Sequence, residues 1–354
     1  MLKFHALSVR RIEADAEEAL AVSLEVPAEF EDEYRGSPGQ HIALRALIDG
    51  EEVRRTYSLI NAPGERPLRI IVRVQPGGRM SGFISRLRAG QTLESLPPNG
   101  SFSPHAGTLG EGLRVAFAAG SGITPVLSVA RSVLAAGGRM IVFYGNRSVA
   151  RTMGLEELER LKDRYPDRLA LHFLMSREPQ EVALYNGRLD AAKVRALSAA
   201  FFDPQGVSEY FICGPGDMGA TVSAALADLG VGAERIRIEH FAAAAAEGIA
   251  RRAAAEPGSA GLAQVTVTLD GRRRSFSMRL DEETVLDAAE RAGLDLPFSC
   301  RSGVCSTCRT KVVRGEVEMA QNYALEDWEV EQGYVLACQS RCKTRELELD
   351  YDEK

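Results

Sequence analysis

The residues best suited to chemistry are four cysteines near the end of the chain. Cys300, Cys305 and Cys308 have the spacing C-x4-C-x2-C, and Cys338 follows after 29 further residues. Four thiolates at this spacing can surround two irons and two bridging sulfides. We therefore predict that these four residues are the ligands of a [2Fe–2S] cluster.

Two alternatives remain open for these cysteines. They could be buried thiols without a metal, or zinc ligands, although zinc sites usually come as two paired C-x2-C knuckles. The loop 301–307 contains Gly303, so its amides can turn inward and donate hydrogen bonds to sulfur, which suits an anionic cluster. Cys342 lies outside the spacing, and we interpret it as a bystander or an oxidation-prone thiol.

Two glycine-containing turns could bind phosphate. Residues 120–125 (GSGITP) follow the strand-like run LRVAFAA, and residues 213–218 (CGPGDM) end the run EYFIC. Glycines allow tight turns, and a pyrophosphate can bind at the start of a helix that follows such a turn. Close packing is the alternative use of such glycines. Because two such turns end strands of one parallel sheet, they favour a shared ligand crevice.

A third motif, RTYS at residues 55–58, lies within a predicted strand. Strand alternation places Arg55 and Tyr57 on one face and Ser58 on the other. An exposed strand edge is the alternative interpretation of this segment.

The segments that position these motifs change character along the chain. The N-terminal region has short alternating strands separated by turn formers, which is typical of an antiparallel β-barrel. Strands and helices then alternate, which predicts a doubly wound α/β domain. After a segment rich in alanine and glycine, a hairpin around Asp-Gly and an amphipathic helix indicate an α+β module. The predicted boundaries are 1–105 (barrel), 106–241 (α/β), 242–261 (linker) and 262–354 (α+β module).

Charge and composition exclude several classes of protein. The chain has 354 residues and a net charge of −6, with no polybasic field, so we expect no nucleic-acid partner. Its N-terminus lacks a signal-peptide core, and no stretch reaches about 18 apolar residues, so we expect a cytoplasmic protein without a membrane partner. Residues 262–354 carry 13 basic and 18 acidic side chains, so the module could orient a protein partner by its negative charge.

Taken together, the motifs RTYS, GGRMS (77–81), GSGITP, YGNR (144–147), CGPGDM and the terminal EHF (239–241) resemble the ferredoxin–NADP reductase family in order and spacing. The segments FSCRSGVCSTC and LACQS resemble plant-type ferredoxins, which implies a β-grasp fold for the last module. The resemblance implies an FAD-binding barrel, then an NADP-binding α/β domain, then the ferredoxin domain.

The resemblance also implies roles for individual residues. Arg55 would contact the flavin pyrophosphate, Tyr57 would pack on the isoalloxazine ring, and Ser58 would hydrogen-bond near its N5 atom. Cys213 would lie on the approach of the nicotinamide, and Phe241 would cover the other flavin face. With Ser58, Cys213 and Phe241, Glu239 completes the implied catalytic set. Further implied cofactor-binding positions are Thr56, Ile71, Val72, Arg73, Val74, Gly78, Arg79, Met80, Ser81, Gly122, Thr124, Asn146, Arg147, Ser176, Arg177, Gly214, Pro215 and Met218.

The chain departs from the family pattern at Phe241. The aromatic residue is a Phe rather than a Tyr, and it continues into the linker instead of ending the chain. Arg147, after the second strand of the α/β unit, and Arg177, after the third, are placed to favour the 2′-phosphate of NADPH over NADH. A solvated surface arginine is the alternative for Arg147.

The order of the three regions, and segments along nearly the entire chain, resemble the reductase components of bacterial phenylacetyl-CoA epoxidase systems. This resemblance implies electron flow from NADPH to FAD, to the [2Fe–2S] cluster, and then to a di-iron oxygenase that epoxidises a CoA thioester. The chain itself has no E-x-x-H pair that could hold such a di-iron centre. The alternatives are a reductase for a Rieske dioxygenase or another hydroxylase, and a non-enzymatic redox sensor or electron carrier.

Overall fold

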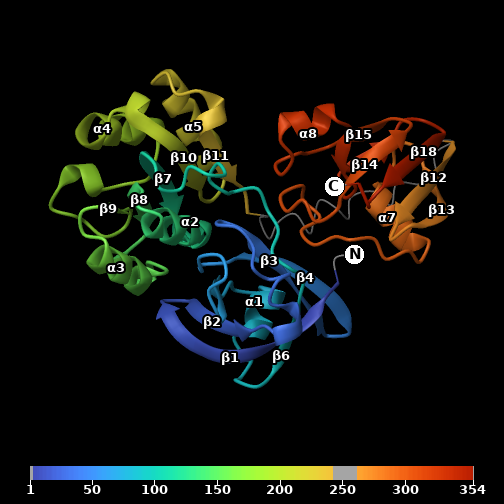
Figure 1. The fold of residues 1–354 in the computed structure, drawn as a ribbon, viewed down its shortest axis with the longest axis horizontal. Helices are drawn as coiled ribbons and strands as arrows, with labels where there is room; N and C mark the ends of the chain where they lie inside the picture. The colour runs from blue at the N-terminus through green and yellow to red at the C-terminus, as the bar shows by residue number, and fades with distance from the viewer. Residues whose placement is uncertain (1–2, 242–260, 354) are drawn as a thin grey trace. The chain divides into compact units, whose positions relative to one another are not determined.

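The computed structural model describes residues 3–241 and 261–353, which form two compact units, one over residues 4–241 and one at the C-terminus (Figure 1). Each unit has its own hydrophobic core, and each is described by itself below. The predicted linker over 242–261 lies, apart from Gly261, outside the described residues.

The first half of unit 4–241 is a six-stranded antiparallel barrel with the strand order β4-β3-β6-β1-β2-β5. An antiparallel bridge between Leu59 and Ile70 links the end of β4 to β5 and closes the sheet. Alternate residues, such as Leu7 and Val9, are buried in the barrel core, as the two-residue period of a strand requires. The elements are β1 (His5–Ala16), β2 (Ala19–Glu25), β3 (His41–Ile48), β4 (Glu51–Ser58), β5 (Leu68–Arg73), α1 (Arg79–Ile84) and β6 (Thr92–Ser95).

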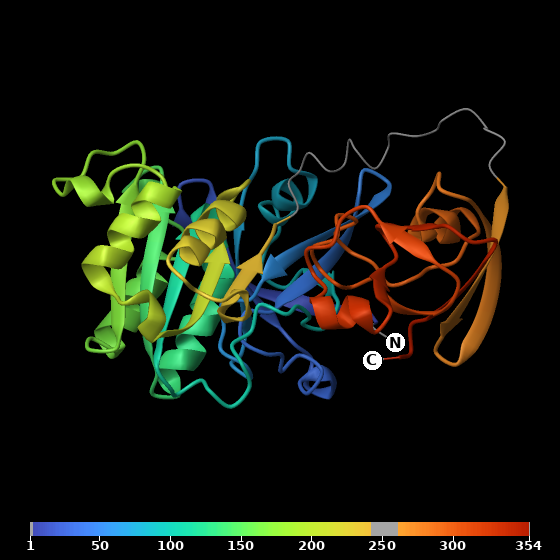
Figure 2. The ribbon, with the colours of Figure 1, turned by 90° about the horizontal axis from the view of Figure 1, so that it is seen from above.

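The second half is a five-stranded parallel sheet with the order β11-β10-β7-β8-β9 and helices on both faces (Figure 2). Ala116 and Ala118 pack in the core with α2 and α3, whereas Val115 and Phe117 pack in the core with α4 and α5. This alternation buries both faces of the sheet, which is the reason its strands are almost wholly apolar. The elements are β7 (Leu113–Ala119), α2 (Ile123–Ala135), β8 (Arg139–Asn146), α3 (Leu155–Arg164), β9 (Leu169–Met175), α4 (Ala191–Phe201), β10 (Val207–Cys213), α5 (Met218–Asp228) and β11 (Ile236–Glu239).

The barrel and the parallel sheet share one hydrophobic core. Ile60, Ile71 and Phe102 from the barrel side pack in the same cluster as Ile123 and Leu127 of α2. Burying apolar surface from both halves stabilises their arrangement, so residues 4–241 form a single unit.

The C-terminal unit has a mixed sheet with the order β13-β12-β18-β14-β16 and a separate ribbon of β15 and β17. The β12–β13 hairpin turns at Asp270 and Gly271, both with positive φ, as a tight Asp-Gly hairpin requires. Thr284 caps α7 by accepting a hydrogen bond from the Asp287 amide at 3.2 Å. The elements are β12 (Leu262–Leu269), β13 (Arg272–Arg279), α7 (Val285–Arg291), β14 (Arg309–Arg314), β15 (Val317–Met319), α8 (Asp327–Glu331), β16 (Tyr334–Leu336), β17 (Ser340–Cys342) and β18 (Glu346–Asp350).

The predicted fold class is confirmed: an antiparallel barrel, a doubly wound parallel sheet and an α+β module follow one another. The helix α4 has no counterpart among the predicted elements. No helix in residues 3–241 or 261–353 combines the length and the apolar composition needed to cross a bilayer.

Candidate functional site

The RTYS motif forms the end of β4. Arg55 and Tyr57 are half-buried, and Ser58 is buried on the opposite face, as strand alternation predicts. Arg55 donates to the carbonyl oxygen of Arg54 at 2.7 Å. Burial lowers the pKa of Arg55, and the positive charge of Arg79 lowers it further, so two cations lie near each other at this end of the barrel. Burial also raises the pKa of Tyr57, which therefore stays a neutral phenol.

The predicted phosphate segment GGRMS turns into α1. A Cβ on Gly78 would lie 2.5 Å from Ser81 Oγ, so this position has no room for a side chain. The Ser81 hydroxyl accepts a hydrogen bond from the Gln75 amide at 3.1 Å. Arg79 pairs with Glu51 at 2.7 Å and donates to a carbonyl of β3, which holds its guanidinium against the barrel.

Some of the predicted cofactor positions turn their side chains into the hydrophobic cores. Met80 and Val72 are 2% and 0% exposed in the barrel core, and Ile71 is 4% exposed in the core shared with α2. Only the backbones of these three residues are available to a ligand. Arg73 and Val74 are half-buried, and Arg73 donates to the carbonyl oxygen of Arg151 at 3.1 Å.

Four polar residues, three of them buried and Glu239 half-buried, meet between the barrel and the parallel sheet. We name His41, Ser58, Cys213 and Glu239 the Glu239 cluster. His41 pairs with Ser58 in the β3–β4 register, and Cys213 pairs with Glu239 in the β10–β11 register. His41 Nδ1 lies 3.7 Å from Glu239 Oε1 and links the two pairs of strands. Burial raises the pKa of Glu239 and outweighs its contact with His41, and burial with the nearby Glu239 raises the pKa of Cys213.

Three atoms of the Glu239 cluster have no hydrogen-bond partner within the part of the chain that the structure describes. They are Ser58 Oγ, His41 Nε2 and Glu239 Oε2, and all three are buried. Buried polar atoms almost always have partners in native proteins, so three orphans together mark a place where a bound polar group completes the hydrogen bonding. A flavin edge fits these atoms, and its phosphates fit the nearby Arg55 and Arg79.

The two predicted glycine turns lie at adjacent strand ends. The strands β7 and β10 are neighbours in the sheet. The strands that follow β7 are added on one side, and β11, which follows β10, is added on the other, so the carboxyl ends of β7 and β10 form the switch point of the sheet. A Cβ on Gly122 would lie 2.0 Å from the carbonyl oxygen of Cys213, so the backbones of the two turns touch. Thr124 opens α2 and donates to the carbonyl oxygen of Ser121 at 3.0 Å. Gly214 contacts Met218, which together with Pro215 completes the second turn at the start of α5.

Four of the predicted cofactor-binding residues, Asn146, Arg147, Ser176 and Arg177, lie side by side at the ends of β8 and β9. Ser176 donates from its amide to the carbonyl oxygen of Asn146 at 2.9 Å, and Arg177 donates in the same way to Arg147. The side-chain nitrogen of Asn146 is buried without a partner among the described residues. Arg147 and Arg177 are both exposed, and no ion pair of either guanidinium occurs in residues 3–241 or 261–353. They could therefore receive an anionic group.

The four predicted cluster cysteines come together in the C-terminal unit. The thiols of Cys300, Cys305, Cys308 and Cys338 lie close enough to shift one another's pKa, so all four are grouped in one place. Hydrogen bonds from Cys305 and Cys338 lower the pKa of Cys300, whereas the bond to Cys300 and burial raise that of Cys305.

The loop around these thiols directs donors at sulfur. The amide of Ser302 donates to Cys300 Sγ at 3.4 Å, and the amide of Cys300 donates to Cys305 Sγ at 3.4 Å. Gln339 Nε2 lies 3.6 Å from Cys338 Sγ. Among the described residues no three histidine, cysteine, aspartate or glutamate side chains are grouped as ligands of one metal ion. A set of four thiols with inward amides fits a [2Fe–2S] group, which divides its ligands between two irons.

Cys342 belongs to a different environment. Its side chain is fully buried in β17, and its thiol donates to the carbonyl oxygen of Thr344 at 2.9 Å. The thiol is part of the hydrophobic core of the module and has its own partner, which agrees with its interpretation as a bystander.

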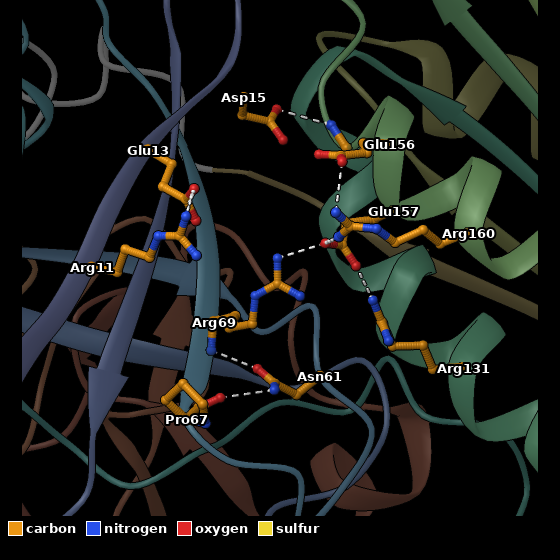
Figure 3. Close-up of polar contacts among 11 residues, drawn as sticks. Arg11, Glu13, Asp15, Asn61, Pro67, Arg69, Arg131, Glu156, Glu157 and Arg160 are labelled. Carbon is orange, nitrogen blue, oxygen red and sulfur yellow. Dashed lines mark hydrogen bonds and ion pairs between the residues drawn. The ribbon is translucent and has the colours of Figure 1, made fainter.

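A second polar cluster between the barrel and the parallel sheet was not predicted. We name Arg69, Arg131, Glu157 and Arg160 the Glu157 cluster (Figure 3). Glu157 Oε1 accepts from Arg69 of the barrel at 2.6 Å and from Arg160 at 3.0 Å, and Arg131 of α2 pairs with the other oxygen. Burial acts to raise the pKa of Glu157, but the arginines, Arg69 foremost, lower it below its usual value. Nearby, Asp15 Oδ2 accepts from the Gly154 amide at 2.9 Å.

The residue that sequence reasoning missed in the functional site is His41. It begins β3 in the segment GQH, and its position opposite Ser58 follows from the hairpin register. Its partner Glu239 is almost 200 residues further along the chain, so no local pattern could have linked them.

Known proteins match the chain over its full length. Family models match at residues 15–103 (oxidoreductase FAD-binding domain), 117–224 (oxidoreductase NAD-binding domain) and 267–343 (2Fe-2S iron-sulfur cluster binding domain). The chain is 38% identical to a component of 1,2-phenylacetyl-CoA epoxidase from Escherichia coli (strain K12), over 100% of this chain and 99% of that protein. It is 33% identical to the ferredoxin reductase component of 3-ketosteroid-9-alpha-monooxygenase from Rhodococcus rhodochrous, over 98% of this chain and 96% of that protein. The structure of phthalate dioxygenase reductase matches with a TM-score of 0.57 and 24% identity, over 98% of both chains.

These matches confirm the resemblance that the motifs indicated, and with it the three predicted cofactor classes: FAD, a [2Fe–2S] cluster and a nicotinamide nucleotide. They also decide between an enzyme and a non-enzymatic redox sensor, because the first two regions match oxidoreductase domains and the full-length relatives are components of oxygenases. The chain belongs to the family of oxygenase reductase components that pass electrons from NAD(P)H through FAD to a [2Fe–2S] cluster, the family that includes this component of 1,2-phenylacetyl-CoA epoxidase.

Proposed function

We propose that this chain is the reductase of a di-iron oxygenase of the phenylacetyl-CoA epoxidase type. The observation that carries the proposal is the 38% identity to the Escherichia coli epoxidase component over 100% of this chain and 99% of that protein. The oxygenase of 3-ketosteroid-9-alpha-monooxygenase represents the second candidate class of partner, supported by 33% identity to its reductase component.

The proposed division of labour follows from where the residues lie. When bound, the flavin accepts a hydride from the nicotinamide and passes single electrons on to the cluster. Arg55, with Arg79 beside it, neutralises the flavin phosphates, and Tyr57 packs on the ring system. Ser58 offers a hydroxyl without a protein partner among the described residues, so it can hydrogen-bond the flavin edge. Thr56 and the backbone of 71–74 line the same barrel edge.

The nucleotide is proposed to lie across the switch point of the parallel sheet. The turns at Gly122–Thr124 and Gly214–Met218 approach closely enough to form one floor for it. Cys213 is fully buried at the start of the second turn. We propose that its thiol keeps water from the approach of the nicotinamide. Phe241 is 38% exposed and is proposed to cover the flavin face where the nicotinamide enters.

NADPH is the proposed nucleotide. Arg147 and Arg177 are exposed at neighbouring strand ends, with the amide of Arg177 donating to the carbonyl of Arg147 at 2.9 Å. This backbone contact makes the two arginines neighbours, and two exposed guanidinium groups on neighbouring strand ends can hold a 2′-phosphate by charge-assisted hydrogen bonds.

The C-terminal unit is proposed to carry the cluster on Cys300, Cys305, Cys308 and Cys338, and to pass electrons to the oxygenase. We propose the domain boundaries 1–105, 106–241 and 262–354, with 242–261 as the linker. The cytoplasmic location remains a prediction.

An anaerobic titration with NADPH and then NADH, followed at the flavin and cluster absorption bands, tests the electron path. We expect both bands to bleach, with NADPH preferred. The oxygenase assignment is then tested by mixing the reduced protein with a phenylacetyl-CoA epoxidase oxygenase component, phenylacetyl-CoA and O2. Epoxidation is the expected result. Turnover only with a 3-ketosteroid oxygenase component would favour the second candidate.

A further inference from the structure

We propose that His41 is a positioning residue that anchors the segment 239–241 to the flavin barrel and holds the Glu239 carboxyl in place for flavin reduction. This inference rests on the proposed function, because it concerns the proposed roles of Glu239 and Phe241. His41 lies on β3 of the barrel, whereas Glu239 is the last residue of β11, an edge strand of the parallel sheet. Their contact therefore connects two separate sheets.

The strand β11 divides its side chains between two neighbours. A Cβ on Gly219 of α5 would lie 2.9 Å from Ile238 and 3.4 Å from His240, so these even-numbered residues pack against α5. The odd-numbered residues turn the other way, and Arg237 lies 3.1 Å from a ring nitrogen of His105. The two-residue period of an extended chain would place Phe241 on the same side as Glu239. The position of Glu239 therefore bears on where Phe241 lies.

The end of β11 needs such an anchor. β11 has only four residues, pairs with β10 alone, and is an edge strand of the sheet. Edge strands hold their ends with fewer hydrogen bonds than central strands do. Because the chain continues beyond Phe241, a fixed contact with the barrel is what keeps the covering aromatic in register with the flavin.

The His41 ring is itself held firmly. A Cβ on Gly100 would lie 3.0 Å from His41 Nδ1, and Gly100 has φ +122°, so the backbone there closes over the ring. His41 is 5% exposed and its backbone bridges Asn99. Nδ1 faces Glu239, while Nε2 has no partner among the described residues. His41 and Glu239 thus contact each other through one side-chain atom apiece. The second polar atom of each, Nε2 and Oε2, is left for a bound group.

The test compares three variants of the flavin- and cluster-loaded protein: His41→Leu, His41→Gln and His105→Leu. His105→Leu is the matched control, since it removes the corresponding histidine contact of β11 two residues earlier, at Arg237. Two quantities are measured: the rate constant of flavin reduction by NADPH in rapid mixing, with its half-saturation concentration, and amide hydrogen exchange of residues 236–241 in the absence of nucleotide.

We expect His41→Leu to lower the rate constant roughly tenfold to hundredfold, with a smaller change in half-saturation, because the reacting groups are misplaced rather than unbound. Exchange in 236–241 should rise. His41→Gln keeps a donor and should recover most of the rate, and His105→Leu should leave the rate unchanged.

Several outcomes would overturn the inference. A wild-type rate in His41→Leu would do so, as would equal losses in His41→Leu and His105→Leu, or unchanged exchange in 236–241. If His41→Leu does not retain flavin, His41→Gln decides by the same two measurements. Failure of the wild-type protein to be reduced by either nucleotide would refute the proposed function instead, and the exchange measurement would still test the anchor.

Discussion

The Glu157 cluster and the Glu239 cluster both lie between the barrel and the parallel sheet, yet their hydrogen bonding differs. In the Glu157 cluster both carboxylate oxygens accept from arginines, and the pKa of the carboxyl is lowered. In the Glu239 cluster one carboxylate oxygen, one ring nitrogen and one hydroxyl have no partner in the described part of the chain, and burial raises the pKa of the carboxyl.

The difference separates a carboxyl that holds the fold from one that awaits a ligand. It concerns the two carboxyls only, since Arg131 Nε of the Glu157 cluster is also buried without a partner among the described residues. A buried carboxylate surrounded by cations stabilises the contact between the two halves and has no capacity left for a substrate. Orphaned buried atoms cost stability, so a protein retains them where a cofactor or reaction needs them. The predictions below test this distinction in each part of the molecule.

The largest effect is expected in the C-terminal unit, where the same distinction separates two kinds of buried thiol. Cys305→Ser should lose both irons while flavin stays bound, because a serine hydroxyl is a poor ligand for this cluster. Cys342→Ser, the matched control, should keep both irons, since that thiol already donates to Thr344. Iron and flavin contents per chain are the measurements. Two irons retained in Cys305→Ser would refute the ligand assignment.

Glu157→Gln should destabilise the protein without affecting electron transfer. Three arginines lose their shared carboxylate, and we expect the free energy of unfolding to fall by roughly 2 to 4 kcal/mol, discounted because the arginines are partly exposed. Urea unfolding followed by flavin absorbance measures the change. The rate constant of flavin reduction in the folded variant should equal that of the wild type. A slowed reduction would mean that the cluster also serves the reaction.

Ser58→Ala should show the opposite pattern. Its hydroxyl has no protein partner among the described residues, so unfolding should change by less than about 1 kcal/mol, while flavin reduction slows roughly tenfold to hundredfold. Ser128→Ala is the control, because the Ser128 hydroxyl accepts from the Gly39 amide and donates to the Asn61 carbonyl. It should lose about 1 to 3 kcal/mol of stability and keep its rate. Equal changes in stability and in the rate of flavin reduction in the two serine variants would contradict the distinction between hydroxyls that hold the fold and hydroxyls that await a ligand.

Arg147→Ala extends the comparison to cations. Arg160 pairs with Glu156 and Glu157, whereas Arg147 has no ion pair within the described residues. We expect Arg147→Ala to raise the KM for NADPH about tenfold and to leave that for NADH nearly unchanged, since the lost contact is with the 2′-phosphate. Arg160→Ala should change neither KM. Equal effects of Arg147→Ala on both nucleotides would show that the phosphate binds elsewhere.

The smallest effect is a difference in pH dependence. The pKa of Glu157 is lowered from 4.5, so its stabilisation is present above pH 4.5 and is lost as pH falls through the folded-state pKa. The pKa of Glu239 is raised from 4.5, so its contribution is full below pH 4.5 and is lost as pH rises through its folded-state pKa. Urea unfolding is therefore followed from well below pH 4.5 up to pH 8, and its pH dependence should flatten below pH 4.5 in Glu157→Gln and above pH 4.5 in Glu239→Gln. The contribution of each carboxyl is the stability of the wild type minus that of its variant. Contributions of Glu157 and Glu239 that change with pH in the same direction would contradict the assignment.

Much of the architecture could be predicted because it depends on local patterns. The strand periods, the Asp-Gly hairpin and the glycine turns each follow from residues close together in sequence, and β12, β13, α2 and α5 occur where these patterns indicate. Three of the four cluster cysteines lie in one short loop and the fourth follows later in the chain, so their spacing alone indicated their chemistry. Met80 and Val72 were harder to interpret, because a motif does not reveal that their side chains face the barrel core.

Sequence alone determined the order of the three regions, the motifs of the flavin and nucleotide turns, and the four thiols, because strand and helix periods and the spacing of particular residue types encode them. Only the tertiary structure decided that His41 meets Glu239, that Gly122 touches the backbone of Cys213, and that Arg69 shares Glu157 with Arg131. These contacts join residues that lie far apart in the chain. The packing of strands and helices from distant parts of the chain creates them, and no local sequence pattern indicates them.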